Sequence, residues 1–254
     1  MFISHLNPVI LDLGPLQVRW YGVFYAIGFL MGYYFIRWLA KRRGIKALDK
    51  DGAGDLIVYL IAGMIIGARF FHVFVFNASY YLVHPAEIIA VWQGGLSFHG
   101  GLLGAIIAAL IFCKKRKIDF LELADITSIP LALGLALGRI GNLINGELYG
   151  TVTNVPWAVK FPAAEGFRHP SQIYESMKNL LIFGILFSLK DKKWRKGTLF
   201  CLFLFMYGML RFALEFFRER DHIIAGISLG QWLCAGMILA AAVIYLFLEK
   251  KRNL

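Results

Sequence analysis

Four polar side chains recur at helical spacing within an otherwise apolar segment near the C-terminus: Tyr207, Arg211, Glu215 and Arg218. Their spacing of i, i+4, i+8 and i+11 puts them on one face of a helix. A charged side chain inside a membrane costs about 2.5–3.5 kcal/mol on insertion scales, so such residues are first candidates for a functional site. The alternative is an interhelical ion pair between Arg211 and Glu215 that only holds helices together.

The segment 137–150 interleaves four glycines with an arginine, two asparagines, a glutamate and a tyrosine. Glycine lets the backbone approach a ligand closely or adopt a positive φ. The guanidinium group of Arg139 offers a planar fork of donors that suits a phosphate. A helix end with ordinary polar capping is the alternative, but the variety of polar side chains favours a binding site.

His99 lies among glycines at the start of another apolar segment, 94–104. A lone histidine is often a hydrogen-bonded interior residue, and this interpretation stays open here. The glycines favour close packing of the backbone against another helix or a ligand.

The sequence gives no support for metal or hydrolase chemistry. The six histidines show no HxH or HExxH spacing and no accompanying acidic cluster, and a GxSxG nucleophile elbow is absent. The cysteines lie singly in apolar runs without a CxxC pair, and we expect them to be packing residues: Cys113, Cys201 and Cys234. We expect no metal and no cofactor.

The composition points to a membrane protein. Of the 254 residues 59% are hydrophobic and 17% are charged, against about 25% charged in ordinary soluble domains. This excludes intrinsic disorder and argues against a soluble globular enzyme. The net charge of +11 could belong to a nucleic-acid-binding protein, but the surface of such a protein would not be rich in Leu, Ile and Phe.

The apolar stretches predict an all-α, polytopic membrane protein, since about 20 apolar residues cross a hydrocarbon core of about 30 Å. The seven predicted spans cover about 20–39, 55–76, 95–113, 120–138, 172–189, 197–217 and 228–248. We expect one transmembrane domain, 1–254, with a small outward-facing loop region around 140–171.

The basic residues predict the orientation. Eighteen of the 27 follow odd-numbered spans: Arg37, Lys41, Arg42, Arg43, Lys46, Lys50, Lys114, Lys115, Arg116, Lys117, Lys190, Lys192, Lys193, Arg195, Lys196, Lys250, Lys251 and Arg252. Because basic residues gather on the cytoplasmic side, the N-terminus is predicted to lie outside and the C-terminus in the cytoplasm. The other nine, which include Arg139 and Arg211, need a different explanation.

This topology places His99, Arg139 and Arg211 in the outward halves of their spans, where we expect them to meet. A buried cluster of Arg, His, Asn, Glu and Tyr suits an anionic lipid headgroup. A channel or transporter for anions would also need polar residues in the inward halves, which are mostly apolar, and no internal repeat is visible. A retinal-binding receptor needs a lysine inside the last span, which has none.

Five sequence blocks resemble the bacterial phosphatidylglycerol–prolipoprotein diacylglyceryl transferase family. Gly-Arg-Ile-Gly-Asn at 138–142 with Gly-Glu-Leu-Tyr-Gly at 146–150 resembles its signature most closely. The other blocks, in the same order as in the family, are 19–22, 94–101, 168–175, and 207–211 with 215–218.

The resemblance implies a seven-helix enzyme of the bacterial cytoplasmic (inner) membrane with its N-terminus outside. It implies transfer of the diacylglyceryl group of phosphatidylglycerol to the thiol of the lipobox cysteine in a prolipoprotein signal peptide. The products are a thioether and glycerol phosphate, and the reaction is the first step of lipoprotein maturation. The implied partners are phosphatidylglycerol, the prolipoprotein and the lipid bilayer, with no nucleic acid.

The family's essential arginines fall on Arg139 and Arg211. Its further functional positions fall on Tyr21, His99, Asn142, Glu147, Gly150, Tyr207 and Glu215. One departure is that the segment between Gly150 and His169 is shorter than in some members.

The implied chemistry fits these residue types. A thiol with a pKa of about 8.5 is a poor nucleophile until it ionises. Arg139 and Arg211 could stabilise the charge that develops on the leaving phosphate, and His99 is the natural candidate to accept the thiol proton. Alternatively, the field of an arginine could lower the thiol pKa without a dedicated base. Tyr21, Asn142 and Glu147 would position the headgroup or the arginines.

Overall fold

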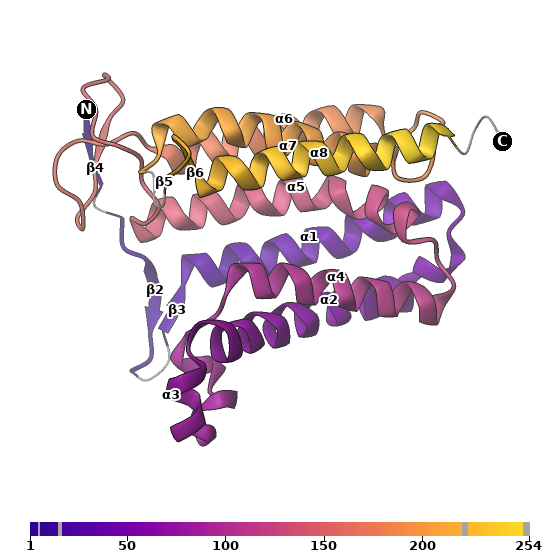
Figure 1. Cartoon of the computed structure of the whole chain (residues 1–254), viewed down its shortest axis with the longest axis horizontal. Helices are drawn as coiled ribbons and strands as arrows, with labels where there is room; N and C mark the ends of the chain where they lie inside the picture. Colours follow the sequence, from indigo (N-terminus) through magenta and orange to yellow (C-terminus); the bar gives the residue numbers. More distant parts are fainter. Residues whose placement is uncertain (5, 15–16, 220–222, 251–254) are drawn as a thin grey trace. The chain divides into compact units, whose positions relative to one another are not determined.

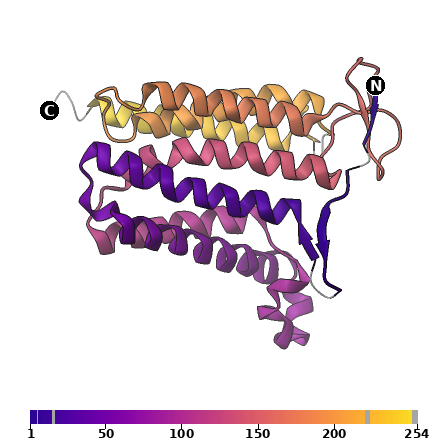
Figure 2. The same cartoon turned by 180° about the vertical axis from the view of Figure 1, so that it is seen from behind.

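The computed structural model describes residues 1–4, 6–14, 17–219 and 223–250, and Figures 1 and 2 show it from opposite sides. Two basic residues used to predict the orientation, Lys251 and Arg252, lie outside the described residues. The chain divides into two compact units, one formed by Met1–Gly32 with Ala124–Leu254 and the other by Tyr33–Leu123.

A long helix covers each of the seven predicted apolar segments. The helices are α1 (Trp20–Arg43), α2 (Lys50–Phe70), α4 (Phe98–Arg116), α5 (Phe120–Asn145), α6 (Ser171–Leu189), α7 (Thr198–Leu214) and α8 (Leu229–Lys250). Among the described residues, all of these but α6 are long and apolar enough to cross a membrane. The all-α class and the multi-pass membrane character are therefore confirmed, whereas the seventh span and the orientation stay predictions.

The remaining elements are short. They are the helix α3 (Ala78–Val83), the π-helical turn η2 (Phe71–Phe76), the 3-10 turns η1 (Lys46–Leu48), η3 (Pro85–Ile89), η4 (Val91–Gln93) and η5 (Glu215–Phe217), and the strands β1 (Phe2–Ile3), β2 (Val9–Asp12), β3 (Gln17–Arg19), β4 (Val159–Lys160), β5 (Ile223–Ile224) and β6 (Ile227–Ser228). β1 pairs with β4 in parallel, whereas β2–β3 and β5–β6 are antiparallel pairs. The connection between α5 and α6 thus contains a short strand.

Several helix ends differ from the predicted spans, among them the start of α2, which lies at Lys50 instead of 55. Two of the differences have a local cause in glycine conformation. The third span was predicted to begin at 95, but α4 begins at Phe98, because Gly94 and Gly95 have positive φ and Ser97 caps the helix by accepting from the Gly100 N–H. The fourth was predicted to end at 138, but α5 continues to Asn145 and ends at Gly146, where φ is +67°.

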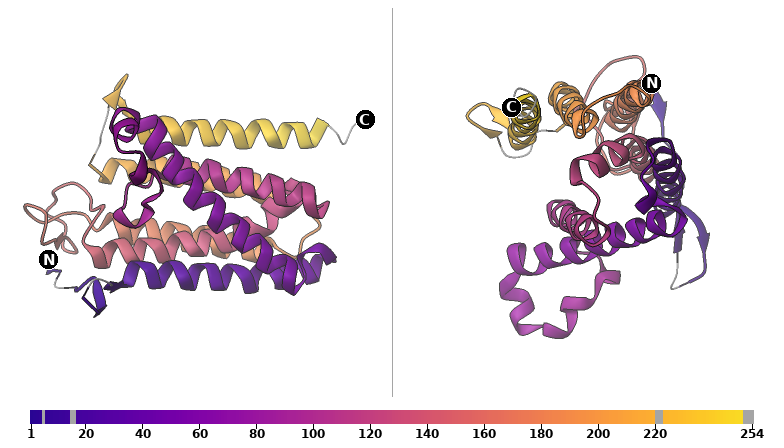
Figure 3. Two further views of the ribbon diagram at one scale, coloured as in Figure 1. Left: turned by 90° about the horizontal axis from the view of Figure 1, so that it is seen from below. Right: turned by 90° about the vertical axis from the view of Figure 1, so that its right-hand side faces the viewer.

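The first unit contains α1 up to Gly32, α5 from Ala124 onward, and the helices α6, α7 and α8. α6 packs against α7 and α7 packs against α8, and Figure 3 shows these helices both from the side and end-on. Fully buried apolar side chains form the core of this unit: Ile126, Ile129, Ile182, Leu186 and Leu199. The buried carboxylate of Asp125 in α5 accepts hydrogen bonds of 2.8 Å from the backbone N–H groups of Gly197 and Phe200, which fixes the start of α7 against α5.

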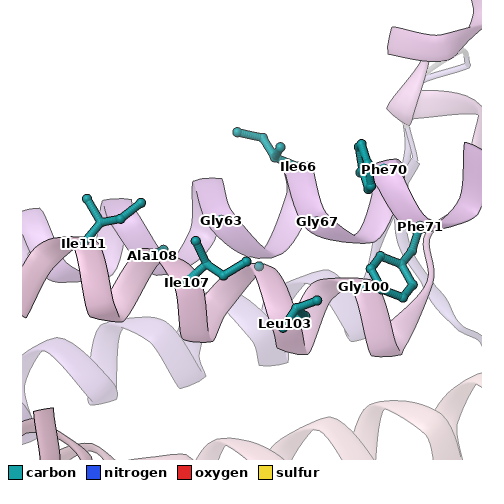
Figure 4. Close-up of a pocket in the computed structure, with 11 residues that line it drawn as sticks. Gly63, Ile66, Gly67, Phe70, Phe71, Gly100, Leu103, Ile107, Ala108 and Ile111 are labelled. Carbon is teal, nitrogen blue, oxygen red and sulfur yellow. The ribbon is translucent and has the colours of Figure 1, made fainter. Parts of the chain in front are cut away.

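In the second unit, α2 and α4 cross at close range through glycines. A Cβ on Gly104 would lie 2.0 Å from the Gly63 oxygen, and one on Gly100 would lie 2.4 Å from the Gly67 oxygen. The predicted crowding of the glycine-rich segment against another helix is therefore confirmed. An apolar groove of about 370 Å³ runs along this crossing (Figure 4).

Candidate functional site

The carboxylate of Glu175 in α6 lies at the centre of a buried ionic cluster within the first unit. Its side chain has no exposed surface. Oε2 lies 2.8 Å from Nζ of Lys178, and Oε1 lies 3.0 Å from Nη1 of Arg211 in α7. Nε of Arg139 in α5 lies 3.9 Å from Oε2. Three neighbouring helices therefore converge on one carboxylate.

Glu215 is the second carboxylate of this cluster. It lies one helical turn beyond Arg211, and its Oε2 is 2.5 Å from Arg211 Nη1. Its Oε1 accepts a 3.0 Å hydrogen bond from the hydroxyl of Ser228. A Cβ at position 230 would lie 2.5 Å from the same oxygen, so Gly230 leaves room for the carboxylate at the start of α8.

These contacts revise the interpretation of the polar face at 207–218. Arg211 and Glu215 do form an ion pair, but within one stretch of chain, and the interhelical partner of Arg211 is Glu175. Tyr207 lies on the same face, and its ring centroid is 3.6 Å from Lys178 Nζ. Helix α7 ends at Leu214, and Arg218 lies in extended backbone beyond η5.

The cluster holds more positive than negative charge. Arg218 interacts electrostatically with Arg139, Arg211 and both carboxylates, and burial together with the two neighbouring arginines lowers the pKa of its guanidinium. Its Nη1 is buried and has no hydrogen-bond partner among the described residues. Four cationic side chains thus surround two carboxylates: Arg139, Lys178, Arg211 and Arg218. A surplus of two positive charges in a buried setting favours an anionic ligand.

Asn142 and Glu147 form a second polar group at the end of α5. The Asn142 amide donates a 2.8 Å hydrogen bond to Glu147 Oε1, which also accepts from Asn145 at 3.2 Å. The Glu147 carbonyl accepts a 2.7 Å bond from the side chain of Gln172 in α6. These bonds fix the turn after α5 against the start of α6.

Gly150 lies where three segments of the chain meet. Its N–H donates to the His169 carbonyl at 2.9 Å, and a Cβ here would lie 2.3 Å from the Phe217 carbonyl oxygen. The absence of a side chain therefore allows this loop to pack closely against the chain after α7. Close packing of the chain, rather than a positive φ, is therefore what requires glycine at this position.

Tyr21 lies near the start of α1 and packs against α5. Its hydroxyl donates a 2.9 Å hydrogen bond to the Tyr25 hydroxyl. A Cβ on Gly141 would lie 2.9 Å from the Tyr21 ring, so this glycine makes room for the tyrosine.

His99 is the one candidate in the second unit, and its predicted meeting with Arg139 and Arg211 stays a prediction. It lies in the first turn of α4, next to a segment that the buried side chain of Arg69 holds in place. Arg69 donates to four backbone carbonyls, at 2.5–3.2 Å: Glu87, Ile88, Gly94 and Gly95. The start of α4 is therefore rigidly supported.

Arg218 belongs to the polar face predicted at 207–218, but Glu175 and Lys178 were not predicted as site residues. The signal was present, because Glu175 and Lys178 interrupt an apolar stretch at i, i+3 spacing, just as Arg211 and Glu215 do at i, i+4. In the part of the chain that the structure describes, no group of three or more His, Cys, Asp or Glu side chains is placed to hold a metal ion.

The fold and the site together define a multi-pass membrane protein with a positively charged cluster among its helices. The family model for prolipoprotein diacylglyceryl transferase matches residues 8–247. The chain belongs to this family of transferases, which confirms the resemblance seen in the sequence.

Relatives match along nearly their whole length. The phosphatidylglycerol–prolipoprotein diacylglyceryl transferase of Geobacter sulfurreducens is 43% identical over 99% of both chains. Its counterpart in Desulfotalea psychrophila is 44% identical over 97% of this chain and 96% of its own, and that of Rhodospirillum rubrum is 38% identical over 98% and 94%.

Proposed function

We propose that the chain transfers the diacylglyceryl group of phosphatidylglycerol to the thiol of the lipobox cysteine of a prolipoprotein, in the first step of lipoprotein maturation. A carbon–sulfur bond forms at the glyceryl carbon while its bond to the phosphate oxygen breaks. The products are a thioether-linked lipid and glycerol phosphate. The observation that carries this proposal is the surplus of positive charge around Arg139 and Arg211.

Arg139 and Arg211 are the proposed catalytic phosphate clamp. Their side chains keep 21% and 16% of their surface exposed, although both pair with the fully buried Glu175. A guanidinium group has five N–H donors, so each arginine can hold its carboxylate and still donate to a phosphate. As the leaving phosphate oxygen gains charge, donors that are already oriented stabilise it without reorganisation.

The proposed substrate-binding residues are those that orient these arginines or pack near them. Glu215 orients Arg211, and Tyr207 lies against the ammonium group of Lys178. Asn142 and Glu147 form a polar pair at the end of α5, the helix that carries Arg139. Tyr21 and Gly150 complete the proposed set through their packing against Gly141 and Phe217.

The proton of the thiol has two proposed routes. His99 can accept it as a catalytic base, since imidazole changes its protonation near neutral pH. Alternatively, the cationic cluster lowers the thiol pKa enough for attack without a base. Because His99 and the arginines belong to different units, the first route requires the whole chain, 1–254, to act as one domain.

The proposed setting is the bacterial cytoplasmic (inner) membrane, with the N-terminus outside, the C-terminus in the cytoplasm and the loop around 140–171 facing outward. Basic residues after odd-numbered helices support this orientation. The proposed partners are phosphatidylglycerol, the lipobox segment of the signal peptide and the bilayer; no cofactor and no nucleic acid take part.

Arg139→Ala and Arg211→Ala are each expected to reduce transfer by at least about 100-fold, because each removes a donor from the developing phosphate charge. The measurement is the transfer of labelled lipid from phosphatidylglycerol to a lipobox peptide by the purified protein. Arg37→Ala, which removes an exposed arginine of α1, is the control and should keep full activity. A peptide with serine in place of cysteine should remain unlabelled. Full activity of Arg139→Ala would contradict the clamp.

His99→Gln is expected to slow transfer mainly below about pH 8.5 if the histidine is the base. The rate of the variant should follow the thiolate fraction and so keep rising up to about pH 8.5, whereas the wild-type rate should level off at a lower pH. The deficit should shrink above about pH 8.5, where the thiol ionises by itself. A variant whose profile keeps the wild-type shape would show that His99 has a structural role and would favour the second route.

Sealed membrane vesicles test the proposed orientation with the same assay. A lipobox peptide that cannot cross the membrane should be modified when it is added to right-side-out vesicles and left unmodified with inverted ones. Opening both preparations with detergent should make their rates equal. Modification only by inverted vesicles would reverse the assigned orientation.

A further inference from the structure

Lys178 is a buried lysine to which the reaction as described gives no role. It lies in α6, one turn after Glu175, and its side chain is 3% exposed. The ammonium group donates a 2.8 Å hydrogen bond to Glu175 Oε2 and lies 3.6 Å from the centroid of the Tyr207 ring. Both contacts satisfy the charge within the cluster.

Burial of this charge needs a reason, because desolvation of an ammonium ion costs several kcal/mol. Packing alone does not require a lysine, since an apolar side chain of similar length would fill the same space without that cost. The neighbouring residues of α6, Met177 and Leu180, are apolar and exposed on the surface of the helix bundle. Lys178 instead points its charge into the cluster.

The geometry around Glu175 indicates what this charge does. A carboxylate has two oxygens. If each oxygen paired fully with one arginine, the guanidinium donors that a phosphate needs would already be occupied. Lys178 takes Oε2, and Arg139 Nε stays 3.9 Å from that oxygen, beyond hydrogen-bond length. Arg139 therefore keeps donors that Glu175 does not occupy.

We propose that Lys178 is a positioning residue for the phosphate of the lipid substrate. It holds one oxygen of Glu175, which leaves Arg139 available to the phosphate, and it supplies part of the surplus positive charge of the cluster. This inference rests on the phosphate clamp of Arg139 and Arg211 proposed above.

Lys178→Met keeps the length of the side chain and removes its charge, so the surplus of the cluster falls from two to one. We expect the KM for phosphatidylglycerol to rise about tenfold and kcat to change less than about threefold, because the lost charge acts on binding of the phosphate. The dissociation constant of glycerol phosphate, measured by calorimetry on the purified full-length protein, should rise by a similar factor. Lys160→Met, which removes an exposed lysine of β4, is the control and should change neither value.

The double variant Glu175→Gln/Lys178→Met separates charge from packing. It removes both members of the buried ion pair and returns the surplus of positive charge in the cluster to two. Glycerol phosphate should therefore bind more tightly to the double variant than to Lys178→Met. If the double variant binds glycerol phosphate no more tightly than Lys178→Met, the net charge of the cluster does not govern phosphate binding, and this result would overturn the inference.

A second comparison applies even if Lys178→Met does not fold. Removing a whole buried ion pair is tolerated better than removing one partner, so the double variant is the safer protein. It should bind glycerol phosphate about tenfold more weakly than Glu175→Gln alone, which carries one more positive charge. Equal affinities of these two variants would overturn the inference.

The same binding measurement on Arg139→Ala distinguishes failure of this inference from failure of the clamp. If Arg139→Ala loses binding and Lys178→Met does not, Lys178 has no positioning role and the clamp stands. If both bind as the wild type does, the clamp itself is wrong. A fall in kcat with unchanged KM and dissociation constant in Lys178→Met would also contradict a role in phosphate binding.

Discussion

The carboxylate of Glu175 is buried completely, and a buried carboxylate is stable only where cations and hydrogen-bond donors surround it. Here the cations come from α5, α6 and α7, so the position of each helix depends on the same two oxygens. Removal of any one of these cations would change the net charge around Glu175 and therefore the contacts of the other two. The site therefore depends on one carboxylate that α5, α6 and α7 share.

The same interaction prepares the arginines for substrate. Arg211 is held between Glu175 and Glu215, and Ser228 of β6, directly before α8, fixes Glu215 in turn. The guanidinium groups are thus oriented before a ligand binds, so binding does not lose the entropy of ordering them. In the second unit Arg69 gives comparable support to the start of α4, where His99 lies.

The sequence predicted the helices well because long apolar runs leave few other structures in a membrane. The predicted end of α5 lies too early, because the apolar stretch stops before Arg139, whereas the helix continues to Asn145 and Gly141 makes room for Tyr21. The face with Arg211 and Glu215 followed from helical spacing. The interhelical partner of Arg211, Glu175, did not, because spacing along one helix does not show which residue of another helix it contacts. The buried polar residues of α6, such as Gln172 and Lys178, also explain why, among the seven long helices that the structure describes, this one lacks the hydropathy of a membrane span.

The central claim is that the surplus charge of the cluster receives the phosphate of the lipid. An experimental structure of the protein with bound phosphatidylglycerol in a lipid nanodisc tests it most directly. Phosphate oxygens should lie about 2.7–2.9 Å from guanidinium nitrogens of both Arg139 and Arg211, while Glu175 keeps its contact with Lys178. A headgroup bound elsewhere, with both arginines still paired only to Glu175 and Glu215, would contradict the account.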